Sequence, residues 1–332
     1  MNQNLRIIAG KTDQKTILDH YLDFSLKTHD FFDNLSVEEE KQQNKVNDLI
    51  KSTLKQNHLQ DLDVKVVIPD EVCSLQIIKL PLVSEKEIVS AIELQAEEFV
   101  PYPIEKASFD YQILSIDKSE NQIYLLIIVT LLELIDRVSD FVLDFGLYPE
   151  SLEPESTAIY RLLINQIYKT DADLVMFINI NNQSTQSSIL NLTQKQLVTT
   201  NSFNIGQNFF YKALQNNLNL SASVAVETFN TITPKDAAFK QIITPLFTEY
   251  AKEVQKTILA TVNKIGTIPK VIYIHSAQSV NTFIQLFNQT NHLKQYQIRP
   301  LIIDNIDSSK IALNESLYSK FSEIVIPLAA LT

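Results

Sequence analysis

The sequence predicts a mixed α/β fold with two domains, and three observations lead to this prediction. Short segments rich in β-branched residues, with the alternating pattern of strands, are interspersed along the chain with longer segments that have helical periodicity. A new run of such elements opens near residue 171. At 332 residues, the chain also exceeds the length at which a single hydrophobic core usually divides. Strand–helix alternation of this kind is typical of α/β domains.

The segment "SEKEIVSAIELQAEEF" (84–99) is predicted to form a helix. Ser84 and Glu87 provide the S-x-x-E pattern of a capping box at its start, and Pro101 ends it. One face of this helix carries Ile88, Ala91, Ile92, Gln95 and Phe99.

The segments "ASFDYQIL" (107–114) and "QIYLLIIVT" (122–130) are predicted to pair as a hairpin. The apolar run Ile123–Leu132 has ten residues, whereas a membrane-spanning helix needs about 20, so it is interpreted as a buried strand. A helix follows at 131–146 and ends at Gly146, a residue type favoured just after a helix.

The other predicted elements follow from the same patterns. In chain order they are a strand at 15–26, a helix at 37–56, strands at 64–70 and 74–81, a helix near 157–168, strands at 173–180, 187–192 and 196–205, helices near 207–217 and 237–264, a strand at 270–274, a helix at 279–289 and a terminal helix.

Composition argues against several classes of function. A net charge of −11 without clustered Lys and Arg argues against a nucleic-acid partner. The five histidines and the single Cys73 lack the spacing of metal ligands, so no metal site is expected. His275 and Ser276 are adjacent but have no third partner, so they are interpreted as loop residues and no catalytic residue is expected. Only four glycines are available to let a backbone approach a phosphate closely.

The cellular compartment of the protein is predicted from its cysteine count and its N-terminal sequence. Cys73 cannot form a disulfide within the chain. The N-terminal "MNQNLRIIAGKTDQK" has no apolar run followed by a small-residue cleavage site. A cytosolic chain is therefore expected.

The stretch "VPYPI" (100–104) is predicted to form a stiff elbow between the helix and the hairpin. The two prolines fix their own φ angles and bias their neighbours toward extended geometry. Val100, Tyr102 and Ile104 are therefore the candidate partner-binding residues, since they cannot all face one core if the backbone is extended. The alternative is that the elbow only joins a helix to a strand.

The motifs around this elbow resemble the PilM family of type IV pilus assembly proteins, which are relatives of the cell-division protein FtsA. The motifs that carry the resemblance are Gln95-Ala96-Glu97, Pro101-Tyr102-Pro103 and Asp110-Tyr111-Gln112. The resemblance covers residues 64–160 well and continues more faintly to Leu328.

The resemblance implies an actin-like (ribonuclease-H-like) two-domain fold with an inserted FtsA/PilM-type subdomain in the first domain. Residues 1–67 would form the first core subdomain, completed by about 151–170 and the C-terminal helix. Residues 68–150 would form the inserted subdomain, and residues 171–332 the second actin-like domain.

The resemblance also implies loops for the phosphates of a nucleotide, and these loops depart from the family pattern. On the second phosphate hairpin, Asn179 and Asn181 stand where the family has Asp and Gly, with Thr185 following. On the first loop, Ile8 replaces an Asp, although Gly10 and Lys15 keep the family spacing.

A third loop departs in the same direction. The family has Ser-Gly-Gly after a strand, where this chain has Ser276 and Ala277. We therefore expect no ATP hydrolysis, no resident cofactor, and at most weak ATP binding.

The resulting hypothesis is a non-enzymatic adaptor on the cytoplasmic face of the inner membrane. The resemblance implies that it binds the N-terminal peptide of a PilN-like membrane protein and links it to the pilus motor. Contact with the motor ATPase and association into a homo-oligomer are left open. Two alternatives remain beside it: an active nucleotide-dependent actin-like ATPase, and the cytoplasmic L-type subunit of type II secretion.

Overall fold

The computed structural model describes residues 3–12, 16–26, 37–165, 170–276, 278–313, 317 and 320–331 of the chain. Strands and helices are mixed throughout the described residues, so the predicted α/β class is confirmed. None of the helices in these ranges is both long enough and apolar enough to cross a bilayer.

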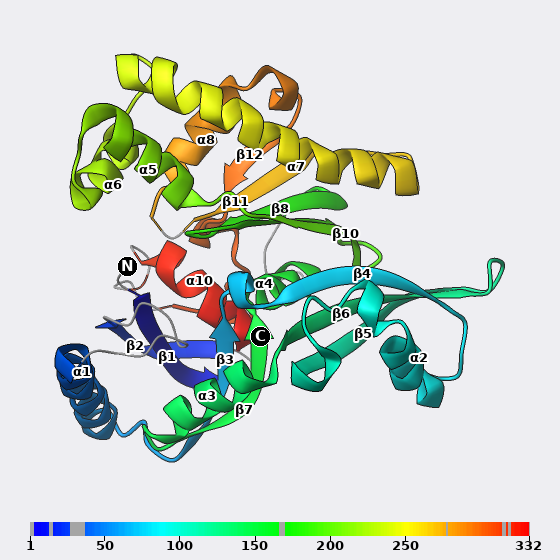
Figure 1. Ribbon diagram of the computed structural model, residues 1–332, viewed down its shortest axis with the longest axis horizontal. Coiled ribbons are helices and arrows are strands. Elements are labelled where there is room, and N and C mark those ends of the chain that lie inside the picture. The colour runs from blue at the N-terminus through cyan, green and yellow to red at the C-terminus, as the bar shows by residue number, and fades with distance from the viewer. Residues whose placement is uncertain are drawn as a thin grey trace.

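The first domain is built on two small groups of strands (Figure 1). Strands β1 (Gln3–Thr12) and β2 (Thr16–Leu26) form an antiparallel hairpin, to which β13 (Ile311–Ala312) adds in parallel. Strands β3 (Leu62–Ile68) and β7 (Leu147–Pro154) pair in parallel.

Helices α1 (Val37–Gln56) and α3 (Leu132–Leu143) cover these strands. Phe24 of β2, Ile50 of α1 and Val142 of α3 belong to one buried apolar cluster, which joins the two groups of strands. Gly146, with a φ of 71°, ends the turn after α3 in a conformation that suits glycine, as predicted.

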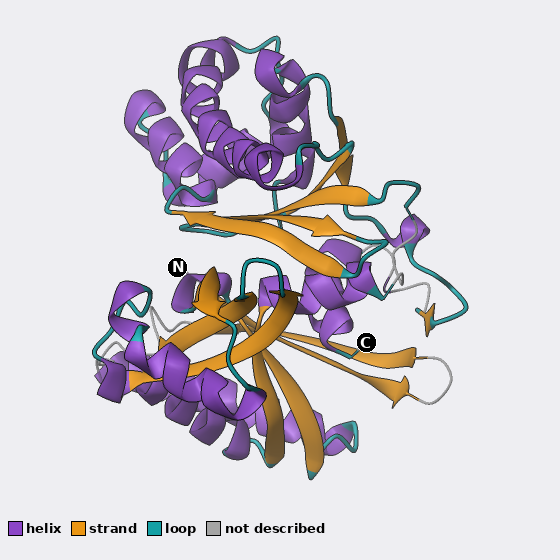
Figure 2. Ribbon diagram, turned by 90° about the vertical axis from the view of Figure 1, so that its right-hand side faces the viewer, coloured by secondary structure: helices purple, strands orange, loops and turns teal. Residues whose placement is uncertain are grey.

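The second domain is a sheet of five strands in the order β10-β9-β8-β11-β12. Its strands are β8 (Leu174–Ile180), β9 (Thr185–Asn191), β10 (Gln196–Phe203), β11 (Val271–His275) and β12 (Gln297–Pro300). The helices α5 (Gln207–Leu218), α6 (Ala222–Thr231), α7 (Thr244–Ile265) and α8 (Val280–Gln289) gather on its outer face (Figure 2). Phe210, Phe229, Phe247 and Phe283 are fully buried in this outer layer and contact one another edge-on, stacked or tilted.

Helices α4 (Glu155–Ile164) and α10 (Phe321–Ala330) lie between the two domains' strands (Figures 1 and 2). Ile159 of α4 and Val325 of α10 share a buried cluster with Phe177, on the inner face of the second sheet. Ile8 of β1 packs against the same cluster from the other side. The two domains therefore share a continuous apolar core, and the chain's C-terminal helix is part of it.

A separate three-stranded antiparallel sheet projects to one side of the first domain (Figure 1). Its order is β4-β6-β5, with strands β4 (Ser74–Pro81), β5 (Ala107–Asp117) and β6 (Gln122–Leu131). The apolar run interpreted as a buried strand is the central strand of this sheet, and the predicted hairpin is confirmed. The division of the chain at residues 68–150 stays a prediction, and the return to β3 begins at Leu147.

The helix predicted at 84–99 is shorter than expected. Only α2 (Ile88–Leu94) is α-helical, between 3₁₀ turns at Glu85–Glu87 and Ala96–Glu98. The predicted capping box is present, with the Ser84 amide donating to the Glu87 carboxylate at 3.0 Å. The Ser84 hydroxyl adds a second hydrogen bond to that carboxylate at 2.6 Å. The late turns tighten because Pro101 disfavours helical geometry in the residue before it.

Five described α-helices and strands were not predicted: β1, β7, α6, β12 and β13. Strand β7 contains two prolines and two glutamates, so its sequence lacks a strand pattern. Strands β12 and β13 have four and two residues, too few for a periodic pattern, and they exist because neighbouring strands bind them. Helix α6 does carry a start signal, since the Ser221 hydroxyl accepts a hydrogen bond from the Val224 amide.

The core of the side sheet gives a stability prediction. Leu125 of β6 is 0% exposed, so Leu125→Ala should destabilise the folded state by about 2–5 kcal/mol through lost burial and a residual cavity. Leu259→Ala, at a position 61% exposed on α7, is the matched control and should be nearly neutral. Denaturant unfolding of both variants measures the difference. Equal losses would mean that β6 is not packed as described.

Candidate functional site

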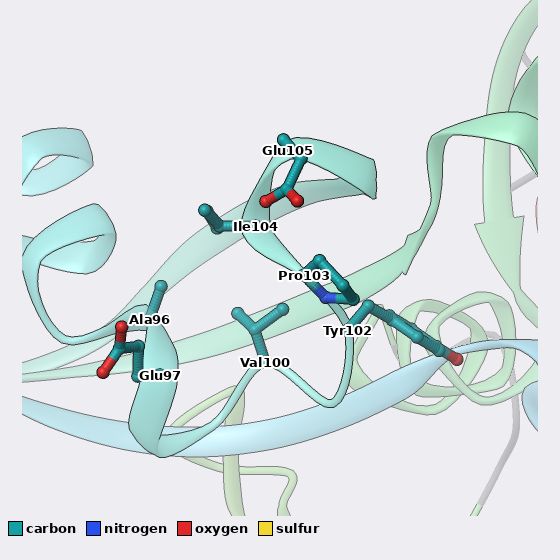
Figure 3. Close-up of a pocket in the computed structure, with 7 residues that line it drawn as sticks. All are labelled: Ala96, Glu97, Val100, Tyr102, Pro103, Ile104 and Glu105. Carbon is teal, nitrogen blue, oxygen red and sulfur yellow. The ribbon is translucent and has the colours of Figure 1, made fainter.

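The elbow between α2 and β5 forms a pocket (Figure 3). It has a volume of about 210 Å³ and lies between the 3₁₀ turns Ala96–Glu98 and Ile104–Lys106. Its lining residues are Ala96, Glu97, Val100, Tyr102, Pro103, Ile104 and Glu105. The three candidate partner-binding residues thus all line one pocket.

The two prolines explain the shape of this pocket. The Val100 amide donates to the Ala96 carbonyl at 2.8 Å, which closes the turn before Pro101. The Lys106 amide donates to the Pro103 carbonyl at 2.9 Å, which closes the turn after it. The extended geometry expected beside the prolines does not include Ile104, because a 3₁₀ turn begins at that residue.

The side chains of the elbow point in different directions. Figure 3 shows Val100 and Ile104 facing the space between the two turns, while the Tyr102 ring points away from them. Ile104 is 44% exposed, whereas Tyr102 is half-buried against the core of the side sheet. Burial, with a smaller contribution from nearby Cys73, raises the pKa of the Tyr102 phenol. Ile104 therefore offers the most exposed of these three side chains, whereas Val100 and Tyr102 are both half-buried and pack against the core of the side sheet.

Two carboxylates stand beside this apolar surface. Glu97 and Glu105 lie on opposite sides of the pocket (Figure 3), and neither forms a hydrogen bond or ion pair with any described residue. Apolar side chains that lie between two carboxylates suit a ligand with an apolar group next to positive charge.

A second site lies at the buried contact between the domains, around Asp70, Glu155 and Asn179, and it is called the interdomain cleft. It holds residues predicted to mark degenerate nucleotide loops. Asn179, at the end of β8, is fully buried. Its Nδ2 donates to the Asp70 carboxylate at 3.1 Å and to the Glu155 carboxylate at 3.0 Å. Asn181 Nδ2 donates to the same Glu155 oxygen at 2.9 Å. The two amides predicted to replace the family's Asp and Gly are therefore occupied by carboxylates of the first domain.

Asp70 and Glu155 are close enough to affect each other's ionisation. Asp70 is 5% exposed and also accepts hydrogen bonds from the Ser156 amide at 3.0 Å and hydroxyl at 2.6 Å. Burial raises the pKa of Asp70, and its hydrogen bonds oppose that rise. Burial and repulsion from Asp70 raise the pKa of Glu155 to about 8. With a pKa of about 8, Glu155 is largely protonated at neutral pH.

His275 extends this network behind Asn179. It is the buried last residue of β11, so its interpretation as a loop residue was wrong. Its Nδ1 lies 2.8 Å from Asn179 Oδ1, and its Nε2 lies 2.9 Å from the Ser322 carbonyl of α10. Burial lowers the pKa of His275 to about 4, and Arg6 contributes to the same direction.

Glu71 reaches the loop between β8 and β9. Its Oε1 accepts hydrogen bonds from the backbone amides of Gln183 at 2.6 Å and Ser184 at 3.1 Å. Thr185, the next residue, faces the other way and is buried, with its hydroxyl donating to the Ile205 carbonyl at 2.7 Å.

The other described residues of the predicted nucleotide loops are packed or hydrogen-bonded within the fold. Ile8 is half-buried against the central core. A Cβ on Gly10 would lie 2.0 Å from the Ile17 carbonyl oxygen, so the close approach of β2 at a bulge requires this glycine. Ser276 is 1% exposed and accepts a hydrogen bond from the Ser279 amide at 3.3 Å. Lys15 and Ala277 lie outside the described residues.

These surroundings do not fit a nucleotide. A polyphosphate requires free amide donors and positive charge, and the cleft presents three carboxylates whose partners are the donors themselves. Among the described residues, no group of three or more His, Cys, Asp or Glu is arranged to hold a metal ion. Asp70, Glu71 and Glu155 had not been recognised in the sequence, where a Pro-Asp-Glu turn between strands has no distinctive pattern.

Comparisons with known proteins give one strong likeness. A sequence model of the family described as type IV pilus assembly protein PilM matches residues 7–300. A solved structure described as a PilM-PilN type IV pilus biogenesis complex superposes with a TM-score of 0.74 at 18% identity, covering 99% of this chain and 95% of that one. Among curated proteins, none matches the chain significantly.

Two other solved structures are more distant. The cytoplasmic domain of EpsL from the type II secretion system of Vibrio cholerae gives a TM-score of 0.47 at 8% identity, covering 99% of this chain and 90% of that one. The ethanolamine utilization protein EutJ of Carboxydothermus hydrogenoformans gives 0.39 at 12% identity, covering 59% and 60%.

The raised pKa of Glu155 predicts how stability depends on pH. Between its ordinary pKa of 4.5 and about 8, the folded state keeps a proton that the unfolded state releases. This contribution to stability is present below pH 4.5 and is lost as the pH rises through 8, with a slope of at most about 1.4 kcal/mol per pH unit.

Glu155→Gln removes that proton exchange but keeps an acceptor for the two asparagine amides. We expect the free energy of unfolding of this variant, relative to that of the original chain, to rise steadily from pH 5 to 8. Denaturant unfolding at each pH measures both values. Glu150→Gln, on an exposed stretch of β7, is the control and should run parallel to the original chain. Parallel curves for Glu155→Gln as well would mean that Glu155 is ionised in the fold.

Proposed function

Because this chain belongs to the PilM family of type IV pilus assembly proteins, whose model matches residues 7–300, we propose that it is a non-enzymatic adaptor of the pilus assembly machine. It has the actin-like fold of that family. It acts on the cytoplasmic face of the inner membrane, binds the N-terminal peptide of a PilN-like membrane protein, and links that protein to the motor.

The observation that carries this proposal is the pocket at the elbow. Ile104 is an exposed branched apolar side chain, and two 3₁₀ turns hold it beside Val100. These turns are already formed before a peptide binds. A preformed apolar pocket lowers the entropy that binding must offset. The solved structure with the same fold is a complex of PilM with PilN, which supports a peptide of that class as the occupant.

The charges around the pocket narrow the partner's chemistry. Glu97 and Glu105 have no partner among the described residues, and the chain as a whole carries a net charge of −11. A peptide with one apolar residue flanked by Lys, Arg or a free α-amino group would pair with these carboxylates as the apolar residue enters the pocket. Ion pairs at the rim of a binding site mainly raise the association rate, and this effect becomes weaker as salt is added.

The non-enzymatic part of the proposal is supported by the cleft. Hydrolysis in this fold class needs a group to hold a metal ion and amides free for phosphate. In this chain Asn179 stands where the family has a carboxylate, and its side-chain amide donates to Asp70 and Glu155. The two carboxyl groups occupy the asparagine donors that a polyphosphate would need.

Partner binding should depend on Ile104. Ile104→Ser should weaken binding of the PilN-like protein's N-terminal peptide roughly ten- to a hundredfold, because the complex loses the roughly 1.5–3 kcal/mol that burying an isoleucine side chain contributes. Calorimetric titration of purified chain with the peptide measures this affinity. Tyr102→Ala should weaken binding at least as much, since it also removes the base of the pocket.

Ile116→Ser is the matched control, because Ile116 is 50% exposed on the same sheet but outside the pocket. It should bind the peptide as the original chain does. A thermal melt shows whether each variant is folded. If Ile104→Ser and Tyr102→Ala are folded and bind normally, the partner site lies elsewhere.

Nucleotide binding is the second test of the proposal. The chain should show no ATPase activity above background and no measurable heat on titration with ATP and magnesium. Its affinity for the partner peptide should be the same with and without ATP. Turnover of ATP would contradict the adaptor function, and magnesium-dependent binding in the micromolar range would contradict the closed cleft.

A further inference from the structure

The outer strand of the side sheet, β5, has an unpaired edge (Figure 1). It pairs with β6 on one side, and no other strand among the described residues pairs with it. An exposed sheet edge presents unpaired N–H and C=O groups, which proteins usually shield with Lys, Pro or a bulge. The eleven residues of β5 include no Lys, Arg or Pro, and its bulge comes only after Ile113. The part of β5 before that bulge is therefore open to pairing with another strand.

The hydrogen bond of the Tyr111 amide shows which backbone groups face this edge. Tyr111 lies opposite Ile127 of β6, but its N–H donates to the carboxylate of the neighbouring Asp110 at 2.8 Å. This N–H therefore points away from β6. In an antiparallel strand, the backbone groups of every second residue face the same side. The N–H and C=O groups of Phe109 and Ile113 consequently face the free edge as well.

The side chains of the same segment alternate between the two faces of the sheet. On one face, Phe109 and Tyr111 are half-buried against the core of the side sheet, and Ile113 is 38% exposed. On the other face, Asp110 and Gln112 are both exposed. The segment thus presents an apolar row on one face and a carboxylate beside an amide on the other.

This segment is complementary to itself when two copies run antiparallel about Tyr111. Phe109 of each copy then lies opposite Ile113 of the other, which pairs apolar side chains on one face. Asp110 of each copy lies opposite Gln112 of the other, which gives an acceptor-only carboxylate an amide donor. Each of these pairs occurs twice, because the arrangement is symmetric.

We propose that the β5 edge is a contact between two copies of this chain, with their β5 strands antiparallel about a two-fold axis at Tyr111. The two side sheets then form one continuous sheet of six strands, three from each copy. The outward backbone groups of Phe109, Tyr111 and Ile113 bond to those of the second copy. The Asp110 carboxylate, which caps the Tyr111 amide in the single chain, accepts from Gln112 of the second copy instead. This contact is separate from the elbow pocket and from any peptide bound there.

The charge of the chain distinguishes a second copy from a foreign strand. Each copy carries a net charge of −11, so two copies repel each other over their whole surfaces. Added salt screens this repulsion and should strengthen the contact. A basic foreign peptide on the same edge would instead be weakened by salt, because its attraction to the acidic chain is screened.

Sedimentation equilibrium of the purified chain, over a range of protein and salt concentrations, measures the association. We expect a monomer–dimer equilibrium that tightens with salt. Gln112→Glu should weaken the dimer roughly two- to thirtyfold, because it sets carboxylates opposite each other at two places. Gln112→Lys should tighten the dimer by a similar factor. Gln60→Glu makes the same charge change at an exposed position before β3, and this control should dimerise as the original chain does.

Backbone amide hydrogen exchange locates the contact. The amides of Phe109, Tyr111 and Ile113 should exchange more slowly as the protein concentration rises, since the second copy covers them. The amides of Asp110 and Gln112 face β6 and are the internal reference, which should be protected at every concentration.

Three results would overturn the proposal. A chain that stays monomeric at every protein and salt concentration would mean that the edge does not bind a second copy. A dimer that is insensitive to Gln112→Glu and Gln112→Lys, or that protects other amides, would place the contact elsewhere. Protection of the three edge amides only after a partner peptide is added would assign the edge to that peptide.

Discussion

The need to satisfy buried carboxylates organises the interface between the two domains. Asp70 and Glu155 lie at the end of β8, where an ionised or protonated carboxyl group without hydrogen bonds would cost several kcal/mol. The donors come from Asn179 and Asn181 in the other domain and from Ser156 at the start of α4. Replacing either asparagine by Asp would place a further negative charge against these groups. The same asparagines that depart from the family's nucleotide pattern are thus required by the carboxylates that face them.

The pocket at the elbow depends on a different constraint and lies on a different part of the molecule. Its two 3₁₀ turns flank Pro101 and Pro103, which cannot donate backbone hydrogen bonds and restrict the residues before them. Tyr102 packs back onto the side sheet, while Val100 and Ile104 face the space between the turns. The proposed adaptor function therefore needs the elbow and the side sheet, and it makes no use of the cleft between the domains.

Much of the fold could be predicted from sequence, because strong local patterns survive in the folded chain. The helix at 37–56 and the strand at 74–81 were predicted with the bounds that the structure gives them. The capping box at Ser84 and the glycine after α3 acted as expected. The short strands β12 and β13 could not be predicted, since they depend on partners distant in the sequence.

The candidate site was only partly predictable for the same reason. The elbow is local, so its prolines and apolar residues could be recognised, although the turn at Ile104 could not. The cleft joins Asp70, Glu155, Asn179 and His275, which are far apart in the chain and follow no motif. Only the folded arrangement brings them together.

We infer that the elbow binds a membrane-protein peptide without nucleotide. The most direct measurement is a map of backbone amide chemical shifts as the PilN-like N-terminal peptide is added, with and without ATP and magnesium. The largest changes should cluster between Ala96 and Glu105 and should be the same in both conditions. Changes centred on the cleft at Asn179, or binding that requires ATP, would contradict it.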